Sequence, residues 1–416
     1  MDDRADGRTT GVLHLADARL DTRGPGDPSR PWRPRRRGSP RRRGSPARLA
    51  LLVAVATTTA GCALFASPTP PADHLPSLAP AGTIGYVACP DALTPVELAT
   101  GVAEPAIPLP IGGTPAPGDF AVATSSNGRT AYVVTTSVPG GATGSADGHN
   151  VLVPVDLVSQ RAERPIVLPG TGAARAVVVL PGGRTVLAAS GDEVVPVDVA
   201  DRRVGVPIVL GRGRAVAGMA LNPQGTTLYV LVAGAVAVVD PSRGAVGPIV
   251  PTGLTVSSAF SPHGIVVSPD GSTIYVVGQG GTDYQGRVLS IAAATDTPGP
   301  VASFAAFGIT QPAALAVVGG GSALAVVDAA NNAVDPLPVT SFASPPSPVP
   351  IPVQPGSAHG SGTQHPSDIV AGPGGRHAWI VDGFDSVVRY DTATRTFSAP
   401  VTVCDGASSM TVAPAP

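Results

Sequence analysis

The sequence predicts an all-β fold, a seven-bladed β-propeller with four-stranded antiparallel blades, and three observations lead to this prediction. Gly and Pro supply 51 and 47 of the 416 residues, and so many helix breakers exclude a helical bundle. A strand–turn–strand pattern recurs seven times at intervals of 42 to 55 residues, which is typical of a toroid or a stacked array. One copy of the pattern is split between the two ends of the repeat region.

Each copy consists of a short apolar strand, a turn that contains Gly, and a second apolar strand. In the clearest copy, Pro269, Asp270 and Gly271 form the turn. Glycine suits this position because a tight hairpin demands a positive φ. Third and fourth strands follow, as at 153–156 and 165–168, which completes a blade. The turn glycines are Gly82, Gly128, Gly183, Gly225, Gly271, Gly321 and Gly375.

The split copy predicts how the ring closes. Gly82 and residues 83–87 supply a turn and a second strand but no first strand, whereas residues 409–414 align with the first strand of the clearest copy. We therefore expect the C-terminal strand to complete the first blade, which removes two exposed sheet edges. Cys89 and Cys404 then fall at the same face of adjacent blades. An even pair in an exported chain predicts a disulfide, and two buried free thiols are the alternative.

The N-terminal region is typical of an export signal. An apolar run at 49–56 follows Arg-rich clusters and precedes small residues. Its end, Ala60-Gly61-Cys62, resembles a bacterial lipobox, with Thr59 where Leu is usual. The resemblance implies cleavage before Cys62 and a lipid on its sulfur; an uncleaved anchor helix is the alternative. We expect a basic disordered leader at 1–48, the signal and lipobox at 49–62, a Pro-rich linker at 63–80 and the propeller at 81–416.

The charge distribution bears on partners. Residues 1–48 hold 13 Arg against 6 Asp, whereas residues 63–416 hold 14 Arg against 23 Asp and Glu. A body with this acidic excess is a poor nucleic-acid binder, because phosphate contacts need clustered cations. We expect a monomer, tethered to the membrane by its lipid, with no nucleic-acid partner.

The segment Pro269-Asp-Gly-Ser-Thr-Ile-Tyr-Val-Val277 resembles the YVTN family of β-propeller repeats, also seen in lactonase-like and surface-layer proteins. The resemblance spans about 82–414. Metal-dependent propeller lactonases imply several acidic or amide ligands for one hard cation, which prefers oxygen. The aligned inner positions here are small, so we predict neither a metal site nor a cofactor; these positions are Ala121, Ala176, Gly218, Gly264 and Ala314.

The candidate ligand site is the channel mouth, where connections lead into the inner strands. The three longest insertions, at 139–150, 280–286 and 357–364, reach the same face and carry His149 and His359. Each polar residue there also has a purely structural interpretation. An Asp can accept hydrogen bonds from backbone amides in a turn, an Arg can neutralise such an Asp, and a His in a turn can simply be solvated. The candidate ligand-binding residues are Asp119, Arg175, Arg214, His263, His365 and Asp368.

No motif for a serine nucleophile, a phosphate-binding loop or a zinc hydrolase occurs, and we predict no catalytic residue. The segment 382–385 is too short for a calcium loop and suits a hairpin turn. The predicted function is an extracytoplasmic, membrane-tethered binding or scaffold module for a protein or glycan of the cell envelope. The alternative that the family resemblance implies is a lactonase-like hydrolase of the 6-phosphogluconolactonase type.

Overall fold

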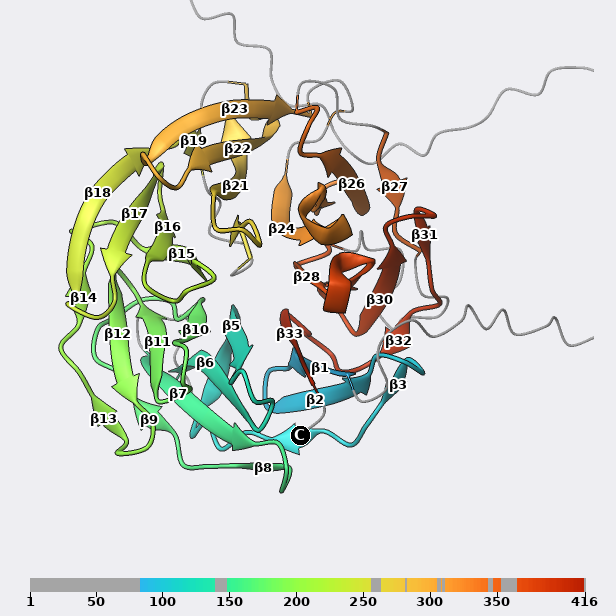
Figure 1. The fold of residues 1–416 in the computed structure, drawn as a ribbon. Coiled ribbons are helices and arrows are strands. Elements are labelled where there is room, and N and C mark those ends of the chain that lie inside the picture. Colours follow the sequence, from blue (N-terminus) through green and yellow to red (C-terminus); the bar gives the residue numbers. More distant parts are fainter. Residues whose placement is uncertain are drawn as a thin grey trace, which may run out of the picture. The chain divides into compact units, whose positions relative to one another are not determined.

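The strands of the computed structural model form seven antiparallel sheets, all within the unit Pro71–Pro416. Figure 1 shows these sheets arranged as blades around a central axis, which confirms the predicted seven-bladed propeller. The predicted leader, signal, linker and Cys62 lie outside the described residues. No helix in the described ranges is long and apolar enough to cross a membrane. The structure describes residues 83–138, 148–255, 263–280, 283–304, 308, 311–342, 347–352 and 365–414.

Each blade has an inner strand nearest the axis and a second strand paired with it. We name the blades A to G in chain order, blade A being the one that contains the first strand. The inner strands are β5 (Thr114–Thr124), β10 (Val177–Val179), β15 (Val216–Leu221), β19 and β20 (Leu254–Thr255 and Ile265–Val267), β24 (Pro312–Val318), β28 (Asp368–Ala371) and, in blade A, β33 (Ser409–Pro414). The second strands are β1 (Thr83–Ala88), β6 (Thr130–Val138), β11 (Thr185–Ser190), β16 (Leu228–Val232), β21 (Thr273–Gly280), β25 (Ala323–Asp328) and β29 (His377–Val381).

The third strands follow, and the outer strands lie at the rim. In four blades the outer strand differs from the prediction, because it is split into two pieces of two residues each. The third strands are β2 (Ala92–Glu97), β7 (His149–Asp156), β12 (Glu193–Asp198), β17 (Ala235–Asp240), β22 (Gly286–Ala292), β26 (Ala333–Pro338) and β30 (Ser386–Asp391). The outer strands are β3 and β4 (Val102–Ala103, Ile107–Pro108), β8 and β9 (Arg161–Ala162, Ile166–Val167), β13 and β14 (Arg203–Val204, Ile208–Val209), β18 (Ala245–Pro251), β23 (Thr297–Ser303), β27 (Val349–Pro350), and β31 and β32 (Thr396–Phe397, Val401–Thr402).

The turns between inner and second strands depend on glycine, as predicted. The six predicted turn glycines that the structure describes all have positive φ, between 67° and 100°. Two of these turns are short 3-10 segments, η3 (Gly319–Gly321) and η4 (Pro373–Gly375). At Gly271 a side chain would also meet Pro223 of the preceding blade at 3.1 Å. Glycine is therefore required both for the backbone conformation and for the close approach of adjacent turns.

The core consists of seven apolar clusters, one at each interface between adjacent blades. Alternate side chains of each strand face one neighbouring blade or the other. The aromatic residue four positions after a turn glycine faces the next blade: Tyr132 packs toward blade C, Tyr275 toward blade F and Trp379 toward blade A. Truncation of such a buried aromatic side chain costs about 3–5 kcal/mol, so each of these residues stabilises its interblade interface.

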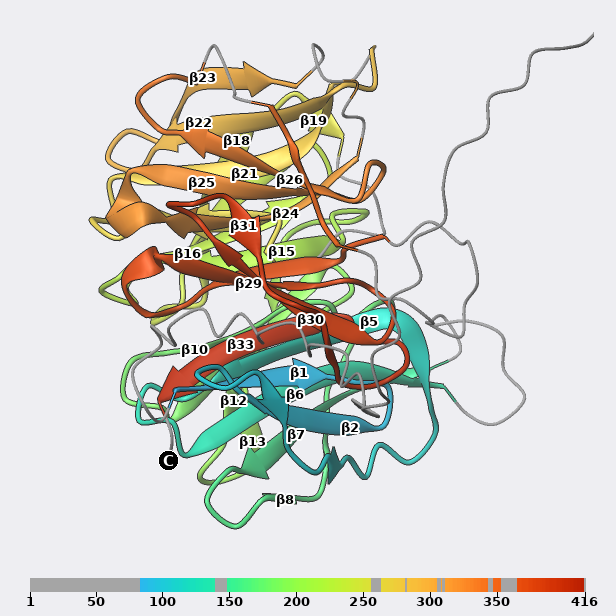
Figure 2. The same ribbon diagram turned by 90° about the vertical axis from the view of Figure 1, so that its right-hand side faces the viewer.

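The C-terminal strand closes the ring, as the split repeat predicted. β33 pairs antiparallel with β1 over six residues, with Ile84 opposite Ala413 and Gly85 opposite Val412. The two strands lie side by side in both views (Figures 1 and 2). Gly85 leaves room for the fully buried Met410 side chain, which a β-carbon at Gly85 would strike. Blade A is thus made from both ends of the propeller.

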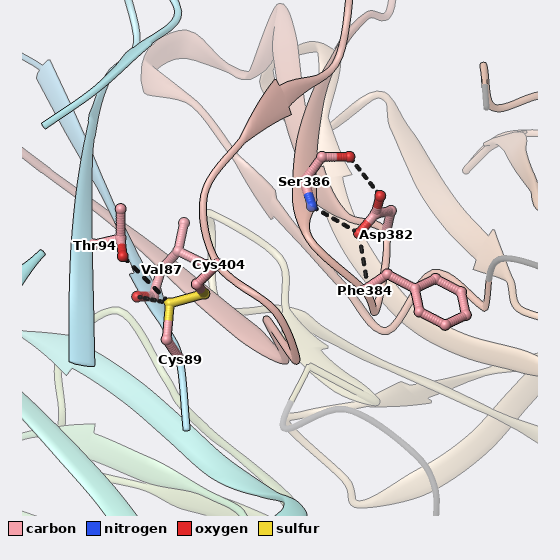
Figure 3. The surroundings of a disulfide bond; sticks show 7 residues. All are labelled: Val87, Cys89, Thr94, Asp382, Phe384, Ser386 and Cys404. Carbon is pink, nitrogen blue, oxygen red and sulfur yellow. Dashed lines mark hydrogen bonds between the residues drawn. A yellow bond between two sulfur atoms is a disulfide. The ribbon is translucent and has the colours of Figure 1, made fainter. Parts of the chain in front are cut away.

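A disulfide joins Cys89 and Cys404, the pairing predicted from the sequence, across a sequence separation of 315. Figure 3 shows it between the corner after β1 and the segment that leads into β33. The turn 382–385 of blade G lies beside this segment, and Asp382 accepts hydrogen bonds from the Phe384 and Ser386 amides, at 2.9 and 3.0 Å. This is the hairpin turn that the sequence predicted. The disulfide therefore ties the two segments that form blade A.

One buried carboxyl group has no compensating contact. Asp335 of β26 is fully buried, and within the described part of the chain neither of its oxygens has a hydrogen-bond partner. It lies on the same face of β26 as Leu337, which packs toward blade E. Burial, together with the nearby Asp328 carboxyl, raises the pKa of Asp335 to about 8. The folded protein therefore holds Asp335 protonated at pH values where the unfolded chain ionises it.

We predict that Asp335→Asn flattens the pH dependence of stability. Because the folded-state pKa is raised, the wild type loses stability as pH rises from about 4 to about 8. The variant cannot ionise at this position, so the difference in stability between the two proteins changes by about 5 kcal/mol across that range, in favour of the variant at high pH. Urea unfolding at several pH values measures this difference. Parallel pH profiles for the two proteins would show that Asp335 is not a neutral buried acid.

Candidate functional site

The predicted site residues lie on one face of the propeller. We call it the loop face, because it carries the connections into the inner strands and those between second and third strands. Arg175 and Arg214 precede β10 and β15, His263 precedes β20, and His365 precedes β28. Adjacent inner strands contact one another around the axis. These residues therefore surround the same end of the propeller axis.

The position predicted for Asp119 needs correction, and several other predicted residues of the mouth lie outside the described residues. Asp119 does not begin its inner strand but lies inside β5, where pairing with β6 is irregular between Pro115 and Phe120. The irregular stretch extends the strand beyond the point that the repeat alignment indicates. The side chain of Asp119 lies outside the described residues, as do His359 and most of the three insertions. His149 is exposed at the start of β7.

The structure brings together two of the predicted residues, His263 and Asp368. The Nδ1 atom of His263 lies 2.7 Å from Oδ1 of Asp368. His263 belongs to blade E and Asp368 to blade G, so the contact spans blade F. The His263 carbonyl also accepts a hydrogen bond of 2.9 Å from the Leu315 amide in β24 of blade F. His263 is therefore fixed to the inner strands of two other blades.

Asp368 is buried with hydrogen-bond donors around it. Its side chain has no solvent exposure, whereas that of His263 is 30% exposed. Oδ1 accepts hydrogen bonds from His263 and from the Ile369 amide, at 2.7 and 2.9 Å, and Oδ2 accepts from the Met410 amide at 3.0 Å. Hydrogen bonds to the ionised form offset the cost of burying a carboxylate. Because Met410 lies in β33, this arrangement exists only in the closed ring.

The carboxylate of Asp368 determines the protonation of His263. Burial by itself lowers the pKa of His263, but the charge of Asp368 and its hydrogen bond outweigh burial, and the pKa is raised above 6.5. The ionised carboxylate accepts, so Nδ1 carries the proton in this pair. His263 is therefore a more readily protonated imidazole than a free histidine. It presents a partly exposed edge at the mouth.

The remaining basic candidates differ in their contacts. His365 is exposed, and its Nδ1 donates to the Ala329 carbonyl of blade F at 2.9 Å, which is a structural link between blades. Arg214 is half-buried, and its Nη1 lies 3.4 Å from the Leu210 carbonyl, a long and weak hydrogen bond. Arg175 is half-buried at the same level of the adjacent blade. Arg175 of blade C, Arg214 of blade D and His263 of blade E thus occupy equivalent positions, each two residues before the inner strand of its blade.

Sequence reasoning missed a polar network behind the mouth. The Asn150 amide donates to the Gly172 carbonyl and to Ser190 Oγ, at 2.9 and 2.7 Å, and accepts from Thr136 Oγ1 at 2.8 Å. Asn150 is 1% exposed, so these contacts satisfy an otherwise costly buried amide. They hold the connection that leads to Arg175. The available signal was a run of polar residues at strand ends, which turns also produce.

The described mouth residues do not fit a cation site. Asp368 is enclosed, and both of its oxygens already accept hydrogen bonds from N–H donors. The aligned inner positions Ala121, Ala176 and Ala314 are buried and supply no ligand atoms in their side chains. No group of three or more His, Cys, Asp or Glu residues in the described ranges is arranged to hold a metal ion.

The fold defines the chain as a β-propeller protein. No protein-family model and no curated protein matches the sequence. Among solved structures, the chain is similar to hydrazine synthase of Kuenenia stuttgartiensis, with 19% identity and a TM-score of 0.56, over 71% of this chain and 90% of that one. It is also similar to the periplasmic gluconolactonase PpgL of Pseudomonas aeruginosa, with 16% identity and a TM-score of 0.58, over 80% of this chain and 99% of that one. At these identities the likeness shows the fold alone.

We predict that Asp368→Asn reverses the pKa shift of His263. Without the negative charge, burial dominates, so the pKa of His263 falls below 6.5. Because a buried hydrogen-bonded acceptor is altered, stability also falls, by about 1–3 kcal/mol. Titration of histidine resonances by nuclear magnetic resonance measures the pKa, with His263→Gln to assign the signal. A His263 pKa that stays above 6.5 in Asp368→Asn would show that the carboxylate is not its cause.

Proposed function

We propose that this protein is an extracytoplasmic, membrane-tethered propeller that binds an acidic glycan of the cell envelope at the mouth of the loop face. The observation that carries the proposal is the His263–Asp368 pair, which is fixed to three blades and partly exposed. The half-buried Arg175 and Arg214 precede inner strands on the same face. Asp368 is enclosed by N–H donors. These hydrogen bonds offset the negative charge of its carboxylate, so it repels an anionic ligand at the mouth only weakly. The mouth therefore favours a ligand that carries carboxylate groups.

The proposed location rests on independent features. The disulfide is typical of an oxidising compartment, and one of the similar solved structures is a periplasmic protein. The predicted export signal and Cys62 supply the route and the lipid anchor. The Pro-rich linker at 63–80 would hold the propeller away from the membrane. Mass spectrometry of the mature N-terminus tests the anchor, since a diacylglyceryl group on Cys62 is the expected product.

The choice of a glycan over a protein follows from the positions of the polar groups in the candidate site. The described ones lie at the starts of inner strands, close to the propeller axis, which suits a narrow ligand. A sugar acid presents carboxylates on a narrow chain, and Arg214 can hydrogen-bond them in bidentate fashion. A protein ligand that binds through the outer loops would leave these groups largely uninvolved.

We predict that Arg214→Ala weakens binding of an acidic oligosaccharide about tenfold, because a charge-assisted hydrogen bond contributes about 1.5 kcal/mol or more. Oligogalacturonate is the probe in isothermal titration calorimetry, and a neutral oligosaccharide of equal length is the reference ligand. Arg243→Ala is the matched control, since Arg243 is in the same blade, 82% exposed, and paired with Asp240. Equal affinity of the two variants, or equal binding of the neutral sugar, would refute the proposal.

A second function is favoured by the same histidine. An imidazole oriented by a buried carboxylate is the arrangement that general-base catalysis uses, and the fold resembles that of a gluconolactonase. In this alternative, His263 removes a proton from a water molecule that attacks the carbonyl carbon of a lactone. The ring oxygen leaves as an alcohol after protonation, and the product is a hydroxy acid.

The hydrolase alternative predicts a specific pH profile. The base is active only when neutral, so the rate of lactone opening falls as pH drops through the pKa of His263, at a midpoint above 6.5. The acid released from gluconolactone, above the uncatalysed background, is the quantity to follow. His263→Gln would reduce that rate at least a hundredfold. A wild-type rate equal to that of the variant would exclude the hydrolase and leave the binding function.

A further inference from the structure

We propose that the closing strand is a working part of the mouth site, and that reduction of the Cys89–Cys404 disulfide by a dithiol loosens β33 and weakens ligand binding at His263. This inference deepens the proposed function, because it assigns a means of regulation to the same site. It rests on contacts that connect the disulfide, the connection before β33, Asp368 and His263 in one continuous series.

The first link is the segment 403–408, which leads from the disulfide into β33. Its amides donate to blade G: Val403 to the Asp385 carbonyl at 2.7 Å, and Gly406 and Ala407 to the Phe384 carbonyl at 2.6 and 3.1 Å. The Ser408 amide donates to the Ala88 carbonyl of β1 at 3.2 Å. The segment is therefore held between blades G and A, and the disulfide is its covalent attachment to blade A (Figure 3).

The second link connects β33 to Asp368. The Met410 amide, six residues after Cys404, donates to Oδ2 of Asp368 at 3.0 Å. The Ser408 carbonyl also accepts a hydrogen bond of 3.0 Å from Ser367 Oγ, next to Asp368 in the chain. Because Asp368 then holds His263, any displacement of β33 changes the position and the solvation of the carboxylate that orients the imidazole. Met410 thus acts as a positioning residue through its backbone.

The coupling must act in both directions. A ligand that requires the oriented His263 binds the closed ring more tightly than the loosened one, so it also stabilises closure. By the same reasoning, loss of the Asp368 carboxylate removes a contact to β33 and makes the disulfide easier to reduce. The rate at which the disulfide is reduced therefore measures this coupling without any ligand.

The surroundings of the disulfide suit its reduction from one side. Cys89 is fully buried, whereas Cys404 is half-buried and next to the exposed Asp405 and Gly406. A thiolate of the dithiol therefore attacks Sγ of Cys404, the bond between the two cysteines breaks, and Cys89 leaves as a thiolate that takes up a proton. The second thiol of the reductant then displaces Cys404 from the mixed disulfide. The products are two cysteine thiols and one oxidised dithiol, with two electrons transferred.

After reduction, Sγ of Cys89 has hydrogen-bond partners both as a thiolate and as a thiol. Thr94 Oγ1 lies 3.3 Å from Sγ of Cys89 and can donate to a thiolate. The Val87 carbonyl lies 3.8 Å away and can accept from the thiol once it is protonated. Figure 3 shows both contacts around the sulfur. The cysteine site is therefore built to accommodate the reduced state as well as the disulfide.

The test follows the pKa of His263 in the full chain by nuclear magnetic resonance, before and after treatment with dithiothreitol. We expect the pKa of His263 to fall toward 6.5 on reduction, because a loosened β33 admits water around Asp368 and weakens the influence of its charge. The Cys89→Ser/Cys404→Ser variant should show the low value with and without reductant. An unchanged His263 pKa in reduced, folded protein would overturn the inference.

A second measurement covers the case in which the double variant does not fold. The wild type and Asp368→Asn are compared for the rate at which dithiothreitol reduces the Cys89–Cys404 bond, followed by the masses of the cysteine peptides. We expect reduction to be at least threefold faster in Asp368→Asn, and equal rates would contradict the coupling. Arg243→Ala, far from the disulfide on the opposite face, should be reduced at the wild-type rate.

Ligand binding distinguishes this inference from the proposed function. Reduction should weaken oligogalacturonate binding about tenfold if both hold. If no acidic or neutral sugar binds in either redox state, the proposed function fails, while the pKa and reduction-rate results still decide the coupling. If the sugar binds equally well in both states, the inference is overturned and the proposed function stands.

Discussion

The pairing of β33 with β1 is the interaction on which the rest of the structure depends. Without β33, the edge of β1 in blade A would be unpaired, and the strand that covers it comes from the far end of the chain. The same strand delivers Met410 to the cluster between blades G and A, and its amide to Asp368. Closure therefore completes a sheet, an apolar interface and a polar site at once.

Burial has opposite consequences at two carboxyl groups of this molecule. Asp368 is enclosed by the His263 ring and two backbone amides, so it can remain charged away from water and raise the pKa of a histidine. Asp335 lacks such donors, so burial raises its own pKa to about 8 and keeps it neutral over much of the physiological range. The comparison shows that the donors, and not the depth of burial, make Asp368 suitable for a functional site.

The repeat made much of the fold predictable. Glycine at the turns, an aromatic residue four positions later and the split copy depend on local backbone geometry and on periodicity, both of which are visible in one sequence. The disulfide followed from closure, because only a closed ring brings Cys89 near Cys404. The split outer strands were not predictable, since two-residue pairings at a rim leave almost no pattern.

The candidate site was only partly predictable, for reasons of geometry. The sequence indicated His263 and Asp368 separately, but 105 residues separate them and their contact depends on the curvature of the ring. The contribution of Met410 is a backbone amide, which no side-chain pattern reveals. Asp119 was misplaced because the irregular pairing in β5 shifts the strand relative to the repeat.

Hydrogen exchange of the oxidised, full-length protein tests the central claim most directly. If the terminal strand is an integral part of blade A, the amides of 409–414 that donate within the sheet exchange as slowly as those of β1, because both open only when the ring opens. Exchange of these amides at the rate of an unstructured peptide, while β1 stays protected, would contradict the closed ring and every conclusion drawn from it.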